Sequence, residues 1–108
     1  MRRGRVYISN QFAGYIEQAD ESFRFWYTKQ WLEREDAEPA SLTLPLSEKV
    51  YESNILFPFF DGLIPEGYLL DIAIQQFGLK NNDRMGLLLK TCHETIGNVS
   101  VFEEEDHE

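Results

Sequence analysis

Asp61 and Glu66 are the residues of this sequence whose types and spacing could most directly support catalysis. Two carboxyl groups beside apolar residues can share general acid–base work, as in a small hydrolase. Both also have structural roles: Asp61 can accept hydrogen bonds from the N–H groups of a turn, and Glu66 suits the N-terminus of a helix that Pro65 opens. We favour the structural roles, because no convincing nucleophile or metal ligand accompanies the pair. A hydrolase is kept as an alternative.

Cys92, His93 and Glu94 form a second candidate, in which a thiol stands next to a base. Neighbouring residues point about 100° apart on a helix and to opposite faces of a strand, so direct pairing is not expected. We predict that Cys92 is a half-buried structural residue. The second histidine, His107, lies in the acidic end of the chain, and two histidines do not make a metal site. Because glycine-rich phosphate loops and kinase catalytic motifs are also missing, we predict no enzyme activity, no metal and no cofactor.

The composition sets limits on size and partners. The chain of 108 residues is enough for one small domain and too short for two. Its formal net charge of −9 argues against nucleic acid and anionic membranes, because both require lysine and arginine on the protein. A single cysteine excludes an internal disulfide and suits a reducing compartment. No apolar run approaches the roughly 18 residues of a membrane span, so we expect a soluble cytoplasmic protein.

Three β-strands are predicted in the first part of the chain, over residues 5–8, 12–18 and 23–28. They form an antiparallel meander, which buries one face and leaves the other in water. Side chains alternate between the two faces of the third strand. We therefore predict that one face, with Phe23, Phe25 and Tyr27, lies in the core. The opposite face carries Arg24, Trp26 and Thr28.

Helices follow the strands. A short helix or turn is predicted to end near Gly62, before a bend. A longer helix is predicted to open at Pro65 and to stop at Gly78, because proline suits a first helical turn and glycine suits the residue after a helix. Asp83 can cap a further helix over residues 84–91.

A last strand over residues 99–102 is predicted to return to the sheet. Residues 41–46 alternate, but their proline makes them an edge strand or an extended segment, and residues 47–54 are predicted to be a loop. Strands, then helices, then a strand indicate the α+β class, with a small antiparallel sheet packed against two or three helices. We predict a single domain over residues 1–108 that ends in an acidic flexible tail at residues 103–108.

The central stretch reads Phe-Phe-Asp-Gly-Leu-Ile-Pro-Glu-Gly over residues 59–67. Residues 41–46 read Ser-Leu-Thr-Leu-Pro-Leu. These motifs resemble the N-terminal domain of HipA-type serine/threonine kinases, the toxins of bacterial Hip modules. Further matching segments are the opening strands with Gly14, the Trp31-Leu32 pair, residues 83–89 and residues 96–99. The resemblance covers about residues 4 to 102 and implies the fold of that domain.

The sequence holds no counterpart of the kinase's ATP-binding core, so the resemblance implies no catalytic residue. A stand-alone copy resembles HipS, the small antitoxin of tripartite HipBST toxin–antitoxin systems. The resemblance therefore implies an antitoxin that binds and neutralises a HipA-like, HipT-type kinase toxin by protein–protein contact. A non-inhibitory scaffold or substrate-recruiting subunit of that kinase is the alternative. A DNA-binding HipB-type protein could join a ternary complex.

The central stretch is predicted to divide between core and interface. Its predicted core residues are Phe57, Phe59, Phe60 and Leu63. A rigid bend that exposes large apolar groups suits an interface hot spot, so we predict partner contacts at Ile64, Pro65, Glu66 and Tyr68. Tyr68, where several relatives carry tryptophan, is the predicted aromatic anchor. Trp26, on the opposite face of the sheet, is a second candidate.

Overall fold

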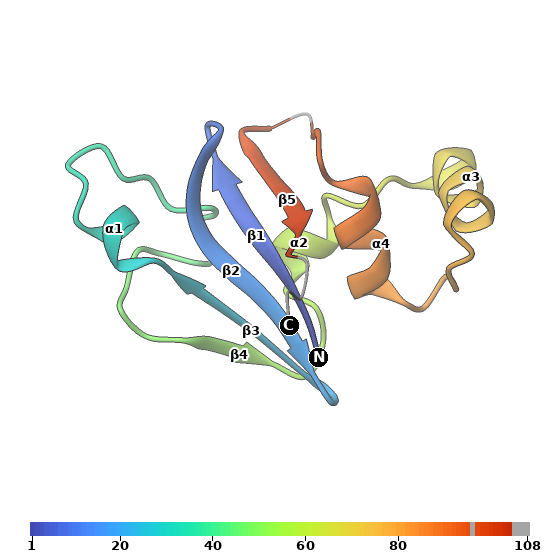
Figure 1. Ribbon diagram of the computed structural model, residues 1–108, viewed down its shortest axis with the longest axis horizontal. Coiled ribbons are helices and arrows are strands. Elements are labelled where there is room, and N and C mark those ends of the chain that lie inside the picture. Colours follow the sequence, from blue (N-terminus) through green and yellow to red (C-terminus); the bar gives the residue numbers. More distant parts are fainter. Residues whose placement is uncertain (96, 105–108) are drawn as a thin grey trace.

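The structure is a computed structural model that describes residues 1–95 and 97–104. Within them the chain forms a five-stranded antiparallel sheet in the order β4-β3-β2-β1-β5, with four helices (Figure 1). The strands are β1 (Arg2–Ile8), β2 (Gln11–Ala19), β3 (Ser22–Tyr27), β4 (Tyr51–Ser53) and β5 (Val99–Glu103). The helices are α1 (Lys29–Leu32), α2 (Pro58–Asp61), α3 (Gly67–Phe77) and α4 (Arg84–Thr91). The predicted α+β class is confirmed.

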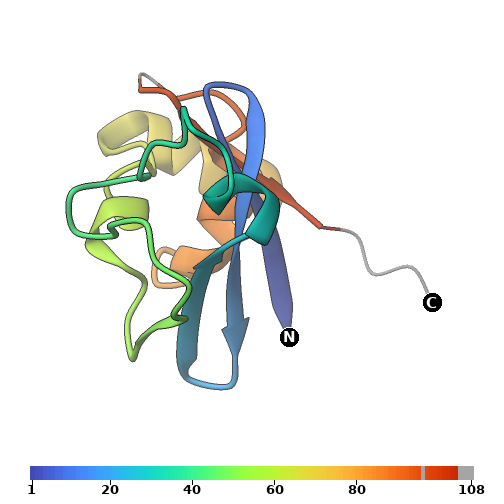
Figure 2. The same cartoon turned by 90° about the vertical axis from the view of Figure 1, so that its left-hand side faces the viewer.

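The predicted meander is formed by β1, β2 and β3, and β5 returns to pair with β1. Ser9 and Asn10 connect β1 to β2 with φ values of 51° and 66°, as a two-residue hairpin turn of the primed type requires. The register shifts by one residue between Val6 and Tyr7, which marks a β-bulge at Ala13, the extra residue on β2. Figure 2 shows the long hairpin and β5 lying beside it.

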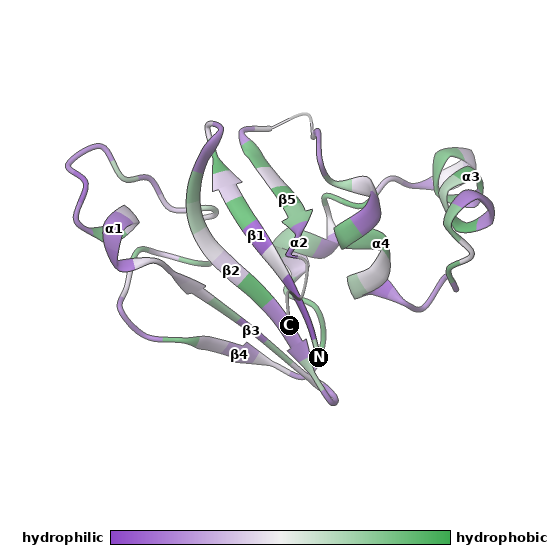
Figure 3. Cartoon of the chain, viewed as in Figure 1, coloured by the Kyte–Doolittle hydropathy of each residue, from purple (hydrophilic) through white to green (hydrophobic). Residues whose placement is uncertain are grey.

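One face of the sheet is buried under α2 and α4. The alternation predicted for β3 is confirmed, because Phe23, Phe25 and Tyr27 are all buried. Hydrophobic and hydrophilic residues alternate along the strands (Figure 3). The helices that cover the sheet contribute buried apolar residues to the core, among them Phe60 of α2 and Leu88 of α4. The largest fully buried side chains are Phe25, Phe60, Ile8, Ile16, Met85, Leu87, Leu88 and Leu89. None of the helices in the described part of the chain is long and apolar enough to cross a bilayer.

The segment between α1 and β4 differs from the prediction. Residues 41–46 form no strand, only an isolated bridge between Ser41 and Leu44. The buried Tyr27 hydroxyl fixes this segment instead, since it donates to the Leu44 carbonyl oxygen and accepts from the Ala40 N–H at 2.9 Å. The predicted loop at residues 47–54 contains β4, whose Tyr51 lies opposite Phe25 of β3.

The charged termini pair with each other. Arg3 and Arg5 belong to β1, and both make ion pairs with Glu104, at 3.4 Å and 3.0 Å. Strand β5 includes Glu103, so the first residue of the predicted acidic tail lies in the sheet. Glu104, the second residue of the predicted tail, makes the ion pairs with Arg3 and Arg5, and residues 105–108 lie outside the described residues.

Asp83 caps α4 as predicted and also joins it to β1. Its carboxylate accepts from the Gly86 N–H at 3.1 Å and from two nitrogens of Arg2 at 2.7 and 3.0 Å. The Arg2 guanidinium holds the pKa of the Asp83 carboxyl below its usual range, and the Gly86 N–H adds to this effect. The ionised carboxylate therefore stabilises the fold above the unfolded-state pKa of about 3.9, and this stabilisation is lost as the pH falls through the folded-state pKa.

Replacing Asp83 with asparagine should isolate this ion pair, because asparagine can still cap the helix. We expect Asp83→Asn to lower the free energy of unfolding at neutral pH by about 0.5–1 kcal/mol, since both partners are partly exposed. The difference from wild type should shrink towards zero in urea titrations repeated at about pH 3. Asp36→Asn, which removes an exposed pair with Arg34, is the control and should cost less. A difference that is independent of pH would contradict this assignment.

Candidate protein-binding surface

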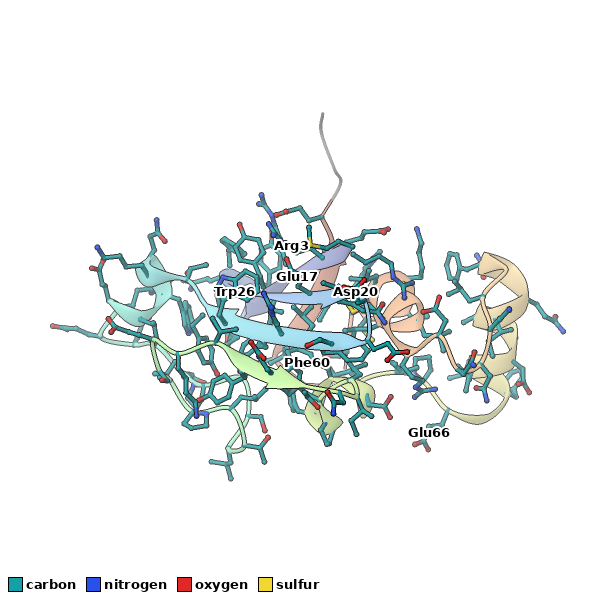
Figure 4. All side chains as sticks on the ribbon, turned by 90° about the horizontal axis from the view of Figure 1, so that it is seen from below. Arg3, Glu17, Asp20, Trp26, Phe60 and Glu66 are labelled. Atoms are coloured by element: carbon teal, nitrogen blue, oxygen red, sulfur yellow. The ribbon has the colours of Figure 1, made fainter. Side chains whose placement is uncertain are left out.

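The first half of the central stretch lies in the core. Phe60 is fully buried, and its ring centroid is 5.3 Å from that of Phe25 on β3. Figure 4 shows Phe60 on the lower side of the sheet, the side that α2 covers. Phe57 is also buried, whereas Phe59 and Leu63 are half-buried and pack against the core. The predicted core role of these four residues is confirmed.

The bend after α2 is held by hydrogen bonds. The Leu63 N–H donates to the Phe60 carbonyl at 3.0 Å, and the Ile64 N–H donates to the Asp61 carbonyl at 3.2 Å. The Asp61 side chain accepts from Arg84 Nε at 2.6 Å, which ties α2 to α4. Asp61 was predicted to accept from the N–H groups of a turn, but among the described residues its carboxylate accepts from Arg84 instead. The Glu66 side chain projects from the surface (Figure 4).

The helix after the bend starts two residues later than predicted. Glu66 is the N-cap, with extended backbone angles and no side-chain capping bond, and α3 begins at Gly67 instead of Pro65. Gly67 has φ of 62°, and a Cβ at this position would meet no other atom within 4 Å. Glycine is therefore favoured here by backbone conformation alone, since it re-aims the chain into the helix. The end of the helix at Gly78, which has φ of 65°, is as predicted.

Helix α3 exposes a row of large apolar side chains. It lies against α4, away from the sheet (Figure 1), and buries only Ala73 fully, with Leu70 and Ile74 partly buried. The exposed fractions are 73% for Tyr68, 57% for Leu69 and 44% for Ile72. Positions 68, 69 and 72 share one side of a helix. An exposed apolar cluster of this kind is a candidate interaction site.

We define the α3 surface as Pro65, Glu66, Tyr68, Leu69 and Ile72. A groove of about 550 Å³ adjoins it, between the bend and the loop that follows α4. The lining of the groove includes the apolar side chains of Leu63, Pro65 and Leu69 and the side chains of two acidic residues, Glu66 and Glu94. The surface thus combines apolar area with negative charge, which suits a basic and apolar partner surface.

The structure brings together only part of the predicted contact set. Pro65, Glu66 and Tyr68 lie side by side at the start of α3, but Ile64 is 3% exposed and packs in the core. A partner therefore cannot reach the Ile64 side chain without unfolding the bend. Trp26 is half-buried and far from Glu66, on the other side of the sheet (Figure 4).

Leu69 and Ile72 are exposed on α3 but are not among the contact residues predicted from the sequence. The signal was present, because the segment from Tyr68 to Phe77 carries more apolar residues than a helix can bury on one stripe. This excess does not tell which apolar residues are exposed, because that depends on α3 contacting α4 and lying away from the sheet.

The thiol and imidazole side chains do not form a catalytic pair. Cys92 is fully buried, so it is less exposed than predicted, and burial raises the pKa of its thiol. The ring of His93 stacks on Phe102 with centroids 4.7 Å apart. In the described part of the chain, residues 1–95 and 97–104, no group of three or more His, Cys, Asp or Glu side chains could hold a metal ion. His107 lies outside the described residues.

Comparisons with known proteins agree with this architecture. A family model described as the HipA N-terminal domain matches residues 4–102. An uncharacterized protein of Haemophilus influenzae is 28% identical over 105 residues, which are 97% of this chain and 95% of that protein. A solved structure described as the N-terminal domain of HipA toxin superposes with a TM-score of 0.73 and 25% identity, over 99% of this chain and 96% of that chain.

A second solved structure contains the fold within a larger chain. It is described as the Shewanella oneidensis MR-1 toxin–antitoxin system HipA, HipB and its operator DNA complex. The match has a TM-score of 0.77 and 23% identity, and it covers 95% of this chain but 24% of the other. The likeness to that structure is one of fold.

Proposed function

The chain belongs to the HipA N-terminal domain family, and from this premise we propose that it is an antitoxin that binds and neutralises a HipA-like serine/threonine kinase toxin of the HipT type. The observation that carries the proposal is the exposure of Tyr68, Leu69 and Ile72 on one side of α3. Leaving these side chains in water forgoes stabilisation of about 25 cal/mol per Å² of apolar surface. A partner that covers them recovers this stabilisation.

The proposed inhibition is non-covalent. Docking through the α3 surface either blocks the active site of the kinase or holds the kinase away from its active conformation. Tyr68 is the anchor, because tyrosine offers large apolar area with few rotatable bonds and a hydroxyl that can find a polar partner. Glu66, next to it and exposed, would pair with a lysine or arginine of the kinase.

A non-inhibitory scaffold or substrate-recruiting subunit of the same kinase is the second candidate. One observation favours it: the protein has another surface rich in aromatic residues, the sheet face that carries Trp26, and it is well separated from the α3 surface (Figure 4). A subunit that joins two components needs two such surfaces. In a ternary assembly, a HipB-type DNA-binding protein is a candidate for the third component.

The first test is co-expression with the products of the neighbouring genes, followed by pull-down and a growth assay. We expect the wild-type protein to capture a HipA-like kinase and to restore growth. Tyr68→Ala should weaken binding by about 30-fold or more, the loss typical of a central hot-spot residue, and should lose the rescue. Leu42→Ala is the matched control, because Leu42 is 96% exposed in the loop after α1, and α1 and α3 lie at opposite ends of the molecule (Figure 1).

Each outcome separates the candidates. Capture with rescue supports the antitoxin, and capture without rescue supports the scaffold. If the wild-type protein captures no kinase, both are wrong. If Tyr68→Ala binds as well as Leu42→Ala does, the contact lies elsewhere on the molecule.

A further inference from the structure

The sheet face opposite α2 and α4, here called the open face, carries aromatic residues where polar ones are usual. An antiparallel sheet with one face in water normally shows polar side chains on that face. Here the outward positions of four strands hold Tyr7, Phe12, Tyr15, Trp26 and Phe102. Figure 4 shows Trp26, Arg3 and Glu17 on this side of the sheet, with Phe60 and α2 on the other.

These aromatic rings form one continuous row across β3, β2, β1 and β5. The centroid distances between successive rings are 5.5 Å from Trp26 to Tyr15, 5.2 Å to Phe12, 5.8 Å to Tyr7 and 5.5 Å to Phe102. Phe102, at the end of the row, is 40% exposed. Tyrosine, tryptophan, phenylalanine and arginine are the residues enriched in interface cores. The other four rings are half-buried, and the guanidinium of Arg3 lies over Tyr15 and Trp26 while that of Arg5 lies over Phe12. The composition of the row together with these arginines is that of a contact surface.

The charges of the open face cancel. Arg3 pairs with Glu17 at 2.8 Å, and Arg3 and Arg5 both pair with Glu104. At the outer strands, Arg24 of β3 lies 3.6 Å from Glu52 of β4. Three arginines thus meet three glutamates, and the face is formally neutral in a chain whose net charge is −9.

This neutrality decides which partner the open face fits. A nucleic acid needs free cationic groups, but each of these arginines already contacts a carboxylate. A second copy of this chain, by contrast, would be repelled wherever the net negative charge is concentrated. On the open face two copies can meet without opposing like charges, because the ion pairs are closed within each copy.

We propose that two copies of this chain associate through their open faces to form a two-fold symmetric dimer. Such an interface is isologous, so the aromatic row of one copy, with the guanidiniums of Arg3 and Arg5 that lie over it, would face the same row of the other. Two sheets packed face to face lie about 10 Å apart, which leaves room for one shared layer of side chains. The strand spacing and rise give a footprint of only about 20 Å by 20 Å, below the standard interface size. We therefore expect a weak dimer, with a Kd of about 10–100 μM.

Sedimentation of the isolated full chain at increasing concentration tests the proposal and does not depend on the kinase. The mass should rise from monomer to dimer between about 1 μM and about 1 mM. Raising the salt concentration should strengthen the dimer several-fold, because salt screens the repulsion between two copies of charge −9 while the ion pairs stay within each copy.

Two variants locate the interface. Phe102→Glu places a negative charge at an exposed position of both open faces, so that the two copies repel each other there. We expect this variant to raise the Kd of the dimer by at least about 10-fold. Tyr68→Glu adds the same charge to the α3 surface and should leave the dimer intact. A monomer at every concentration, a dimer weakened by salt, or a dimer lost with Tyr68→Glu and kept with Phe102→Glu would each overturn the proposal. Kinase capture by wild type tests the proposed function separately.

Discussion

Replacing Phe60 with alanine should lower the free energy of unfolding by about 3–5 kcal/mol, the range for truncating a fully buried phenylalanine. Phe60 has no exposed surface, and its ring contacts those of Phe25, Phe57 and Phe59 at centroid distances of 5.3, 6.4 and 5.2 Å. Phe60 is the buried residue of α2, and its contact with Phe25 of β3 joins this helix to the sheet. The loss would take a large part of the 5–15 kcal/mol that stabilises a domain of this size.

The neighbouring residue supplies a matched control. Phe59 has the same side chain one position earlier but is half-buried, so Phe59→Ala leaves a smaller cavity and should cost about half as much. Urea titrations followed by far-UV circular dichroism measure both values. Equal losses for the two variants would show that burial of the aromatic cluster does not control stability here. We also expect Phe60→Ala to lose partner binding only through unfolding, because Phe60 is not on the α3 surface.

Much of the sheet could be predicted because its strands follow a period of two. Phe23, Phe25 and Tyr27 alternate with polar or half-buried residues, and the buried face follows directly. Strand β4 could not be predicted, since its three residues are too few for a pattern and form a strand only because β3 offers them a partner. The segment at 41–46 misled for the opposite reason, because it alternates but pairs with no neighbouring strand. The Leu44 carbonyl oxygen accepts from the Tyr27 hydroxyl, and the Leu44 N–H donates to the Ser41 carbonyl within the segment.

The bend shows a similar limit for the candidate site. Pro65 correctly indicates a break before α3, but the start of the helix depends on Gly67, whose positive φ is visible only in the structure. Ile64 has the same apolar character as Leu69 and Ile72, yet it is buried while they are exposed. Ile64 belongs to the hydrogen-bonded bend, where its N–H donates to the Asp61 carbonyl and its side chain lies in the core, whereas Leu69 and Ile72 belong to the exposed side of α3.

The open face illustrates a further limit. Trp26 could be assigned to the outer face of its own strand, but the aromatic row exists only across strands. Tyr15 lies opposite Trp26, and Phe12 lies opposite Tyr7 only because of the β-bulge after Val6. Without the register of three strand pairs, each aromatic residue is an isolated apolar residue in the sequence.

Gly14 is the position in the sheet where a single added methyl group should have the largest effect. A Cβ on Gly14 would collide with the backbone carbonyl oxygen of Trp26 on the paired strand β3. Backbone cannot move aside as a flexible side chain can, so Gly14→Ala must push β3 away from β2. We expect a loss of about 3 kcal/mol in the free energy of unfolding, at the upper end for over-packing.

Gly78→Ala separates this steric effect from the intrinsic cost of replacing glycine. Gly78 has φ of 65°, and a Cβ at this position would meet no other atom within 4 Å, so only backbone strain of about 1–2 kcal/mol is expected. Gly14→Ala should also change the fluorescence of the native state, because displacing β3 moves the Trp26 ring from Tyr15, whereas Gly78→Ala should not. If the two variants cost the same and the native fluorescence of both is that of wild type, then β2 and β3 approach less closely at Gly14 than the structure describes. In that case the register of the aromatic row, which runs from Trp26 through Tyr15, would have to be revised together with the dimer built on it.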